Sequence, residues 1–292
     1  MKSPKIILVL FVLSVLSCRE STNNTELLDD IKSLTKNKKL NIGLSVKDDN
    51  GNEILSINGN KKFKLYSVGK YFSAVYLFHL IDRGILSLDQ NITFSKEDLN
   101  PDLYSPLQDS IPDGGNITLK QAINYSVKRS DNNVFDKLTK VSGGFAGLNS
   151  FICSVSPCNG NFSMKSLYKN PNNTMENNIV TPKYATTILN KVNNGSVISE
   201  RSNKLLKRFM MHSVTDTRIQ GIIKDKTISF HKSGTSGRVN GTITSVNDIG
   251  IVSLKNEKTF SIAVFISNSK ESDETNDRLI AEITYLVYKK LN

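Results

Sequence analysis

Strand patterns at both ends of the chain, with helical patterns between them, limit the possible folds most. Apolar runs rich in β-branched residues predict strands at 40–46, 54–57, 227–232, 241–254 and 260–267. Apolar residues at helical spacing predict helices at 27–34, 67–83, 118–125, 132–140, from 182 onward, at 200–211 and at 279–287. The sequence therefore predicts an α+β fold. One antiparallel sheet is built from both chain ends and flanked by the terminal helices, with an all-α lobe inserted between its halves.

The same order predicts the domain organisation. We expect residues 19–292 to form a single domain, because about 270 residues is an ordinary size for one domain. Its α/β lobe would comprise about 25–64 and 213–292, and its all-α lobe about 65–212. Within the α lobe, residues 100–116 are dense in Pro, Gly, Asp and Asn and predict a loop.

The first of three short strings with catalytic side chains is Ser67-Val68-Gly69-Lys70. A Ser hydroxyl is a poor nucleophile at neutral pH and needs a nearby base. Residues three apart share a helix face, so Lys70 is the candidate base for Ser67. A helix N-terminus at Ser67 would also favour negative charge developing there. By itself this four-residue string arises often by chance. The alternative to a catalytic pair is an exposed helix start with a solvated Lys70.

The second string is Ser130-Asp131-Asn132. Ser130 could relay a proton to a leaving nitrogen, and Asn132 could donate its side-chain amide to a substrate carbonyl. Asp131 is expected to hold the loop in shape. The plain alternative is a turn or helix cap, which these three residue types favour.

The third string, Lys232-Ser233-Gly234-Thr235-Ser236, follows a β-branched strand. The Lys232 cation would lower the pKa of a proton-relaying hydroxyl and attract a substrate carboxylate. The hydroxyls of Ser233 and Thr235 would hydrogen-bond that carboxylate. The backbone N–H of Ser236, together with that of Ser67, predicts an oxyanion hole. The alternative is an ordinary edge strand with a Gly-rich end.

Together the three strings resemble the motif set of the class A β-lactamases and the related penicillin-binding proteins. The neighbouring segments YSVGKYFSAVYLFHLIDRG (66–84), RSDNN (129–133), NDIGIV (247–252) and FSIAVFIS (260–267) are similar to that family too. The resemblance covers about residues 40–292 and is weakest near 145–178.

The resemblance implies a site in the cleft between an all-α lobe and an α/β lobe. It implies Ser67 as the acylating nucleophile, Lys70 and Ser130 as proton carriers, and Asn132, Lys232, Thr235 and Ser236 as substrate contacts. Arg218 would add a cation for the substrate carboxylate, or else lie solvated at the surface. The substrate would be a β-lactam, with a cell-wall peptide as the other option, and the protein would act as a monomer. No metal or organic cofactor is implied, and the three His residues are not spaced as a ligand set.

One part of the family pattern is missing from the polar segment 154–181, which predicts a long loop. The family carries there a Glu that positions the deacylating water, about seventeen residues before the Pro that matches Pro182. Counting back leads to Lys165, and its neighbours include no carboxylate. Glu176 is the only acid between 160 and 182, and its use would need an unusual loop path. Tyr168 or Asn170 falls near the position of the family's Ω-loop Asn.

The missing Glu leaves three functions open. The first is a serine β-lactamase that acylates Ser67 and hydrolyses the product, with slow deacylation. The second is a penicillin-binding or D,D-peptidase-like protein that traps the acyl group without efficient turnover. The third is an inactive lipoprotein that binds cell-wall ligands, which is disfavoured because Ser67, Lys70, Ser130 and Lys232 are all present.

The N-terminus predicts export. Two lysines precede an apolar run from Ile6 to Leu16 that is too short for a mature membrane span. The run ends in Leu16-Ser17-Cys18, which resembles a bacterial lipobox and predicts a lipid on Cys18 after residues 1–17 are removed. We therefore expect a periplasmic, membrane-anchored lipoprotein with a leader over 1–18. A plain cleaved signal peptide and a soluble periplasmic protein form the alternative.

The remaining bulk features add little about partners. The net charge is +11, but the lysines are scattered and no nucleic-acid motif is present, so we expect no nucleic-acid partner. A positive field would attract anionic substrates. In an oxidising compartment Cys153 and Cys158 could form a small-loop disulfide, and two free thiols are the alternative.

Overall fold

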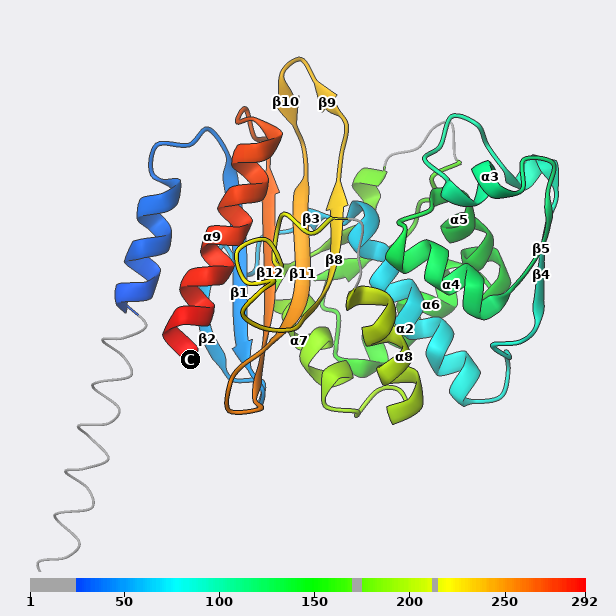
Figure 1. Cartoon of the computed structure of the whole chain (residues 1–292), viewed down its shortest axis with the longest axis horizontal. Helices are drawn as coiled ribbons and strands as arrows, with labels where there is room; N and C mark the ends of the chain where they lie inside the picture. Colours follow the sequence, from blue (N-terminus) through cyan, green and yellow to red (C-terminus); the bar gives the residue numbers. More distant parts are fainter. Residues whose placement is uncertain (1–24, 170–174, 212–214) are drawn as a thin grey trace, which may run out of the picture.

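The computed structural model describes residues 25–169, 175–211 and 215–292, and it gives no side-chain placement for Glu176 (Figure 1). The predicted leader and Cys18 lie outside the described residues. In the described part of the chain, no helix is both long and apolar enough to cross a membrane.

A five-stranded antiparallel sheet joins the two ends of the chain. Its order is β2-β1-β12-β11-β8, so β1 near the N-terminus pairs directly with β12 near the C-terminus. Leu44 opposes Val264 in that ladder. The strands are β1 (Asn41–Asp48), β2 (Glu53–Ile57), β8 (Ser229–Thr235), β11 (Val246–Ser253) and β12 (Thr259–Ser267). The predicted sheet from both chain ends is confirmed, and β8 is left at the edge.

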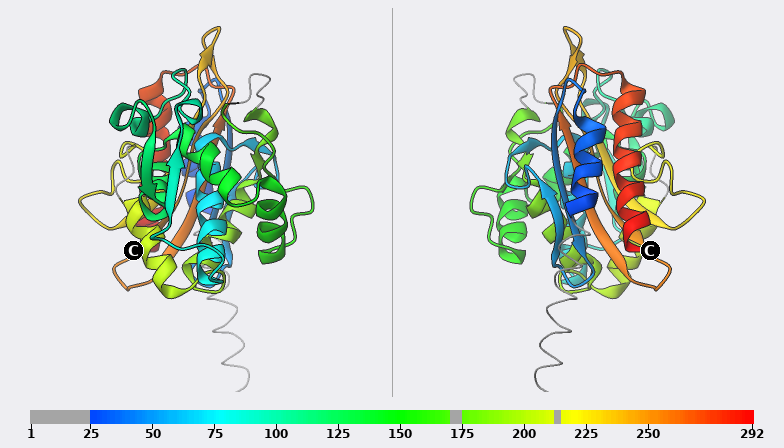
Figure 2. Two further views of the ribbon diagram at one scale, coloured as in Figure 1. Left: turned by 90° about the vertical axis from the view of Figure 1, so that its right-hand side faces the viewer. Right: turned by 90° about the vertical axis from the view of Figure 1, so that its left-hand side faces the viewer.

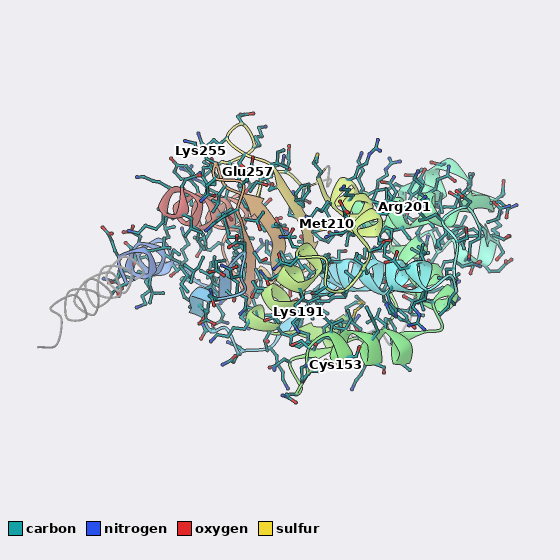
Figure 3. All side chains as sticks on the ribbon, turned by 90° about the horizontal axis from the view of Figure 1, so that it is seen from below. Cys153, Lys191, Arg201, Met210, Lys255 and Glu257 are labelled. Atoms are coloured by element: carbon teal, nitrogen blue, oxygen red, sulfur yellow. A yellow bond between two sulfur atoms is a disulfide. The ribbon has the colours of Figure 1, made fainter. Side chains whose placement is uncertain are left out.

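Helices cover both faces of this sheet. The helix at 25–35 and α9 (Asp273–Leu291) lie on one face, and α7 (Pro182–Asn193) lies on the other. Figure 3 looks along the strands and shows α7, with Lys191, on the side opposite α9. Because both faces are covered, β12 is buried along nearly its whole length and reads as a continuous apolar run.

The second lobe is mainly helical, although the structure adds the short β4–β5 pair to it, and it is built around α2 (Gly69–Asp82). Ten of the fourteen α2 residues are buried, because other helices pack around most of its circumference. The surrounding helices are α4 (Leu119–Lys128), α5 (Asn132–Val141), α6 (Phe145–Val155) and α8 (Glu200–Met211). Side-chain caps begin several helices: the Thr118, Asp131 and Thr181 side chains accept the N–H of Gln121, Val134 and Tyr184.

Short elements complete the fold. They are β3 (Phe63–Lys64), β4 (Asn91–Phe94), β5 (Gly115–Thr118), β6 (Phe162–Ser163), β7 (Ile179–Val180), β9 (Arg238–Val239), β10 (Thr242–Ile243), α3 (Pro106–Ser110) and the 3₁₀ turns η1 (Tyr66–Val68), η2 (Lys96–Asp98) and η3 (Met175–Asn177). The predicted loop at 100–116 therefore contains α3, and the segment 154–181 adds two short strands to β3. Elements this short carry too little periodicity to predict.

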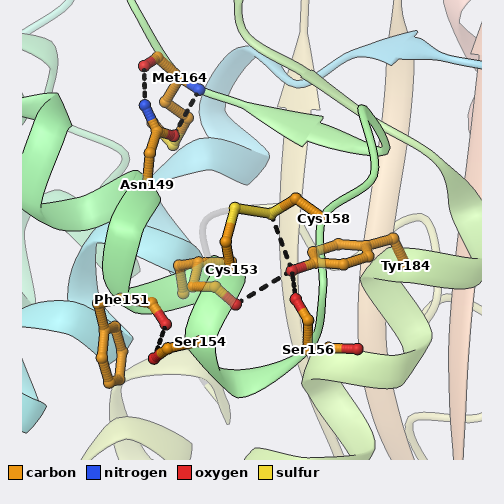
Figure 4. The surroundings of a disulfide bond; sticks show 9 residues. Asn149, Phe151, Cys153, Ser154, Ser156, Cys158, Met164 and Tyr184 are labelled. Carbon is orange, nitrogen blue, oxygen red and sulfur yellow. Dashed lines mark hydrogen bonds between the residues drawn. A yellow bond between two sulfur atoms is a disulfide. The ribbon is translucent and has the colours of Figure 1, made fainter.

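Cys153 and Cys158 form a disulfide, so the first of the two alternatives for these residues is confirmed (Figure 4). The bond joins the end of α6 to the start of the segment that leads to the active site. Cys158 Sγ lies 3.1 Å from the hydroxyl of Tyr184, which donates to the backbone carbonyls of Ile152 and Ser156. This cluster fixes the entry to the long loop against α7.

Replacing both cysteines by Ser should lower the free energy of unfolding by about 2 kcal/mol, the loop-closure entropy expected for a ring this small. Urea unfolding of the oxidised wild type and of the double variant would measure this difference. The dependence of the free energy of unfolding on urea concentration should be the same for both proteins. Reduced wild-type protein is the matched control and should unfold like the variant. An unchanged urea midpoint would contradict this account.

Candidate active site

Ser67 and Lys70 lie side by side at the start of the central helix. Ser67 is in η1 and Lys70 is one residue inside α2, so their side chains share a face. Lys70 Nζ lies 2.9 Å from Ser67 Oγ. Tyr66, immediately before the nucleophile, adopts a left-handed backbone with φ of 45°. Such strain in a non-glycine residue is held by its surroundings and is common beside reacting groups.

The second string closes over Lys70 from α5. Lys70 Nζ donates to the Ser130 carbonyl (2.9 Å) and to Asn132 Oδ1 (2.6 Å), and Ser130 Oγ is 3.5 Å away. With Oδ1 used in this way, the Asn132 side-chain NH₂ group remains for a ligand. Asp131 holds the loop, as predicted: it accepts from Ser105 Oγ, from Leu107 N–H and from Val134 N–H.

Lys232 reaches the same hydroxyl from the sheet. Its Nζ donates to Ser130 Oγ (3.1 Å) and to the carbonyl of Ser233 (2.9 Å). Lys70 and Lys232 are both fully buried. The structure thus brings the three strings together, and polar contacts lead from Ser67 through Lys70 and Ser130 to Lys232.

Gly234 lets the edge of the sheet approach the nucleophile. A Cβ atom there would lie 2.8 Å from the Leu65 carbonyl, 2.9 Å from Val68 N and 3.0 Å from Ser67 N, all of them backbone atoms. Contacts under 3.0 Å do not occur for real Cβ atoms, so only glycine allows β8 and η1 to lie this close. The Ser67 N–H therefore lies against the edge of β8.

The predicted role of Ser236 in the oxyanion hole is wrong. Its backbone N–H donates to the carbonyl of Ser245 (2.9 Å), and its Oγ accepts from the N–H groups of Thr244 and Ser245. Ser236 therefore closes the β9–β10 hairpin. N–H groups alternate in direction along a strand, so the Thr235 N–H points away from β11, toward the open edge of β8. The Thr235 N–H, and not that of Ser236, is therefore the candidate for the second oxyanion donor.

Arg218 is buried behind β8, with 5% of its surface exposed, which excludes a solvated arginine. Its Nη2 donates to Thr235 Oγ1 (2.8 Å), its Nη1 to the Asn247 carbonyl (3.0 Å) and its Nε to Asp277 (2.7 Å). The guanidinium therefore adds positive charge behind the hydroxyl predicted to contact a substrate carboxylate. Ser233 lies between Lys232 and Gly234 on β8 and is 5% exposed.

Burial changes the protonation of both lysines. Desolvation, reinforced by the charge of Lys232, holds the pKa of Lys70 well below its usual range. Desolvation lowers the pKa of Lys232 to about 7, while Asp248 raises it and Arg218 lowers it further. Lys70 can therefore exist as the neutral amine that a general base must be.

Tyr168, and not a carboxylate, reaches the nucleophile from the long loop. Its hydroxyl lies 3.1 Å from Ser67 Oγ, and Lys70 Nζ lies 4.5 Å from the centre of its ring. The backbone N–H groups of Tyr168 and Lys169 donate to the two oxygens of Asp136, at 2.8 and 2.6 Å. Burial raises the pKa of the Tyr168 hydroxyl, so it keeps its proton at neutral pH.

The position found by counting, Lys165, is exposed and takes no part in this contact. Its backbone N–H donates to Asn178 Oδ1 instead (2.7 Å). Tyr168 lies fourteen residues before Pro182, so counting on the family spacing points three residues too early. The signal in the sequence that could have pointed to Tyr168 is its hydroxyl, the group that contacts Ser67. Asn170 and the Glu176 side chain lie outside what the structure describes.

Among the described residues, no group of three or more His, Cys, Asp and Glu side chains is placed to hold a metal ion. His231 precedes Lys232 on β8. Its side chain is buried and contacts Asp248 through Nδ1 at 2.9 Å.

Comparisons with known proteins agree on one family. The chain matches the beta-lactamase enzyme family over residues 26–291. It is 31% identical to beta-lactamase VEB-1 of Pseudomonas aeruginosa over 297 aligned positions, which cover 97% of this chain and 96% of that protein. It is 33% identical to a beta-lactamase of Bacteroides uniformis, with 90% of each chain covered. The solved class A beta-lactamase of Bacteroides cellulosilyticus superposes with a TM-score of 0.86 at 29% identity, covering 92% of this chain and 98% of that one.

Proposed function

The chain belongs to the beta-lactamase enzyme family. We propose that this protein is a serine β-lactamase whose acyl-enzyme is hydrolysed slowly. β-Lactams acylate Ser67, and the acyl group leaves slowly because no carboxylate assists the water. The observation that carries the proposal is the Tyr168 hydroxyl 3.1 Å from Ser67 Oγ. It occupies the approach to the nucleophile from the loop that normally supplies the base of this family.

Acylation has all the groups it needs. Neutral Lys70 takes the proton of Ser67 as the oxygen attacks the lactam carbonyl. The N–H groups of Ser67 and Thr235 stabilise the oxyanion. Ser130 delivers a proton to the departing nitrogen and regains one from the Lys70 ammonium, whose Nζ lies 3.5 Å from the Ser130 Oγ. The Lys232 cation beside Ser130 stabilises the transient negative charge. Asn132, Thr235 and Arg218 orient the substrate through its carbonyl and its carboxylate.

Deacylation lacks a matching base. Water attack on the ester needs a group near neutral pKa within hydrogen-bond reach. The Tyr168 pKa is raised, so this hydroxyl stays protonated and cannot act as the base. Within the described residues, no carboxylate contacts Ser67 or the amine of Lys70. Loss of a positioned base typically slows such a step by about a hundred- to ten-thousand-fold.

Intact-protein mass spectrometry of residues 19–292 with benzylpenicillin tests the proposal directly. We expect a covalent adduct that persists while penicilloic acid accumulates slowly, and Ser67→Ala should show neither. An adduct that never decays would favour the second candidate, an acyl-trapping penicillin-binding protein. Rapid turnover without a visible adduct would contradict slow deacylation. If neither an adduct nor penicilloic acid appears, the β-lactamase function is contradicted, and a cell-wall peptide becomes the substrate to test.

The acylation rate should also depend on pH in a specific way. The second-order rate constant reports the free protein, so it should rise with pH as Lys70 loses its proton. The second-order rate constant should fall again above about pH 7, because Lys232 loses its proton there and no longer attracts the substrate carboxylate. The first-order rate constant at saturation should fall less, because a bound carboxylate raises the Lys232 pKa. Stopped-flow acylation with a chromogenic cephalosporin measures both, and a flat second-order profile from about pH 6 to 9 would contradict these assignments.

We further propose that the protein is a monomeric periplasmic lipoprotein anchored through Cys18. The support is the Leu16-Ser17-Cys18 string after a short apolar run. Mass spectrometry of the membrane fraction should find a lipidated N-terminal peptide in the wild type. In Cys18→Ser that peptide should be absent and the protein should leave the membrane, whereas unchanged membrane retention would contradict the anchor. Light scattering of residues 19–292 measures the oligomeric state, and a dimer would contradict the proposed monomer.

A further inference from the structure

A cationic cavity lies directly behind the loop that carries Tyr168. It has a volume of about 360 Å³ and lies between α5 and the segment 165–169. Its charged lining residues are Lys137, Lys140, Lys165, Lys169, Asp98 and Asp136. Two lysines therefore come from the helix and two from the loop, with two aspartates among them.

The aspartates neutralise these lysines only in part. Asp98 binds Lys137 Nζ at 2.6 Å, and Lys140 Nζ reaches it only at 3.9 Å. Asp136 is occupied by two backbone N–H groups of the loop. Within the described chain, neither Lys165 nor Lys169 makes an ion pair, and Lys169 Nζ donates to the Glu97 carbonyl. The cavity therefore keeps a net positive charge and has amines on both of its walls.

The cavity shares a wall with the active-site loop. The Asp136 carboxylate lines it and also holds the N–H groups of Tyr168 and Lys169. Tyr168 is the residue whose hydroxyl contacts Ser67. A ligand that binds Lys140 on α5 together with Lys165 and Lys169 on the loop would fasten the two walls together. It would thereby hold Tyr168 against the nucleophile.

We propose that this cavity binds a small phosphate-type oxyanion and that its binding prolongs the life of the acyl-enzyme. Several ammonium groups around a small cavity match a multiply charged oxyanion, with each amine donating to a separate oxygen. Free phosphate and the phosphate of a sugar ester or lipid headgroup share this chemistry. The effect on lifetime rests on the slow deacylation proposed above, but the binding does not.

Binding is tested first in Ser67→Ala, which cannot be acylated and so separates the two proposals. Calorimetric titration with inorganic phosphate, at constant ionic strength set with chloride, should give saturable binding. Lys140→Gln/Lys165→Gln should weaken it by about tenfold or more. The matched control, Lys120→Gln/Lys128→Gln, removes the same charge from a separate groove between α4 and α8 and should leave it unchanged. Equal losses in both double variants, or no saturable binding, would overturn the site.

Further titrations distinguish the sources of phosphate. Glucose 1-phosphate and vesicles of phosphatidylglycerol are compared with the inorganic ion. The half-enclosed cavity should accept the two small ligands and exclude the vesicle. Vesicle binding that depends on Lys140 and Lys165, without binding of either small ligand, would overturn the proposal of a small soluble anion.

The effect on lifetime is then measured with active protein. The benzylpenicillin adduct should decay about fivefold more slowly in saturating phosphate than in chloride, and the Lys140→Gln/Lys165→Gln variant should show no such difference. Binding without any change in adduct decay would overturn the coupling to Tyr168. If no adduct forms at all, the proposed function fails while the calorimetry still decides the site.

Discussion

Tyr168→Glu should shorten the life of the benzylpenicillin acyl-enzyme by about a hundred- to ten-thousand-fold, the usual contribution of a positioned general base. The Tyr168 hydroxyl already lies 3.1 Å from Ser67 Oγ, so a carboxylate on the same backbone is directed at the same region. Removing the ring frees space beside Lys70, where the attacking water can lie. The Lys70 amine, which contacts no carboxylate in the described structure, gives the new anion a partner.

Two matched variants separate a base from an enlarged cavity. Tyr168→Gln has nearly the shape of Glu but cannot take a proton, and Tyr168→Phe removes only the hydroxyl. Both should keep the long-lived adduct. Single-turnover decay of the adduct, followed by mass spectrometry, measures all four proteins. If Gln accelerates decay as much as Glu does, water access and not a missing base limits deacylation here.

The same substitution should slow acylation. A carboxylate beside Lys70 stabilises its ammonium form and raises its pKa, so less neutral amine is available at neutral pH. In the wild type, burial and the charge of Lys232 lower the Lys70 pKa and outweigh Asp131 and Asp136, which act in the opposite direction. We infer that the tyrosine favours rapid trapping of the antibiotic over its release.

Gly234→Ala should lower the acylation rate by about a hundred- to a thousand-fold, the cost of losing one oxyanion-hole donor. The added methyl would lie within 3.0 Å of three backbone atoms of 65–68, and backbone cannot rotate away as a side chain can. The edge of β8 must then move from η1, which separates the N–H groups of Ser67 and Thr235. Binding of the substrate should weaken much less, because the Arg218 guanidinium is held behind the strand by Asp277 and the Asn247 carbonyl.

Gly237→Ala is the control for that prediction. It lies three residues further on, and a Cβ there has no neighbour within 4 Å. Its acylation rate should match the wild type. Stopped-flow acylation of both variants gives the comparison, with circular dichroism to show that each is folded. Equal rates for Gly234→Ala and the wild type would mean that the oxyanion is held elsewhere.

Local patterns were sufficient for the main framework. The helices over 67–83, 118–125 and from 182 onward, and the strands 40–46 and 260–267, all depend on neighbours within a few residues. The pairing of the two chain ends followed from the need to give the strands partners. The three strings could be recognised because each is short, and the structure brings all three to one site.

The corrections all concern contacts between distant segments. Ser236 was assigned to the oxyanion hole, but the direction of an N–H depends on which segment lies beside it, and the carbonyl of Ser245, just before β11, accepts that of Ser236. Counting along the loop led to Lys165, because a spacing in sequence does not show the path of the chain. The Asp136 carboxylate on α5 selects Tyr168 and Lys169 by binding their N–H groups.

The sequence by itself determined the fold class, the family and the candidate nucleophile with its candidate base, because those depend on local spacing and on the order of the strings. The tertiary structure alone decided the burial of Lys70 and Lys232, the position of Arg218 and the identity of the loop residue at Ser67. The physical reason is that pKa values and hydrogen-bond partners depend on desolvation and on atoms far away in the chain. Tyr168 and Ser67 are 101 residues apart, and only folding places their hydroxyls 3.1 Å from each other.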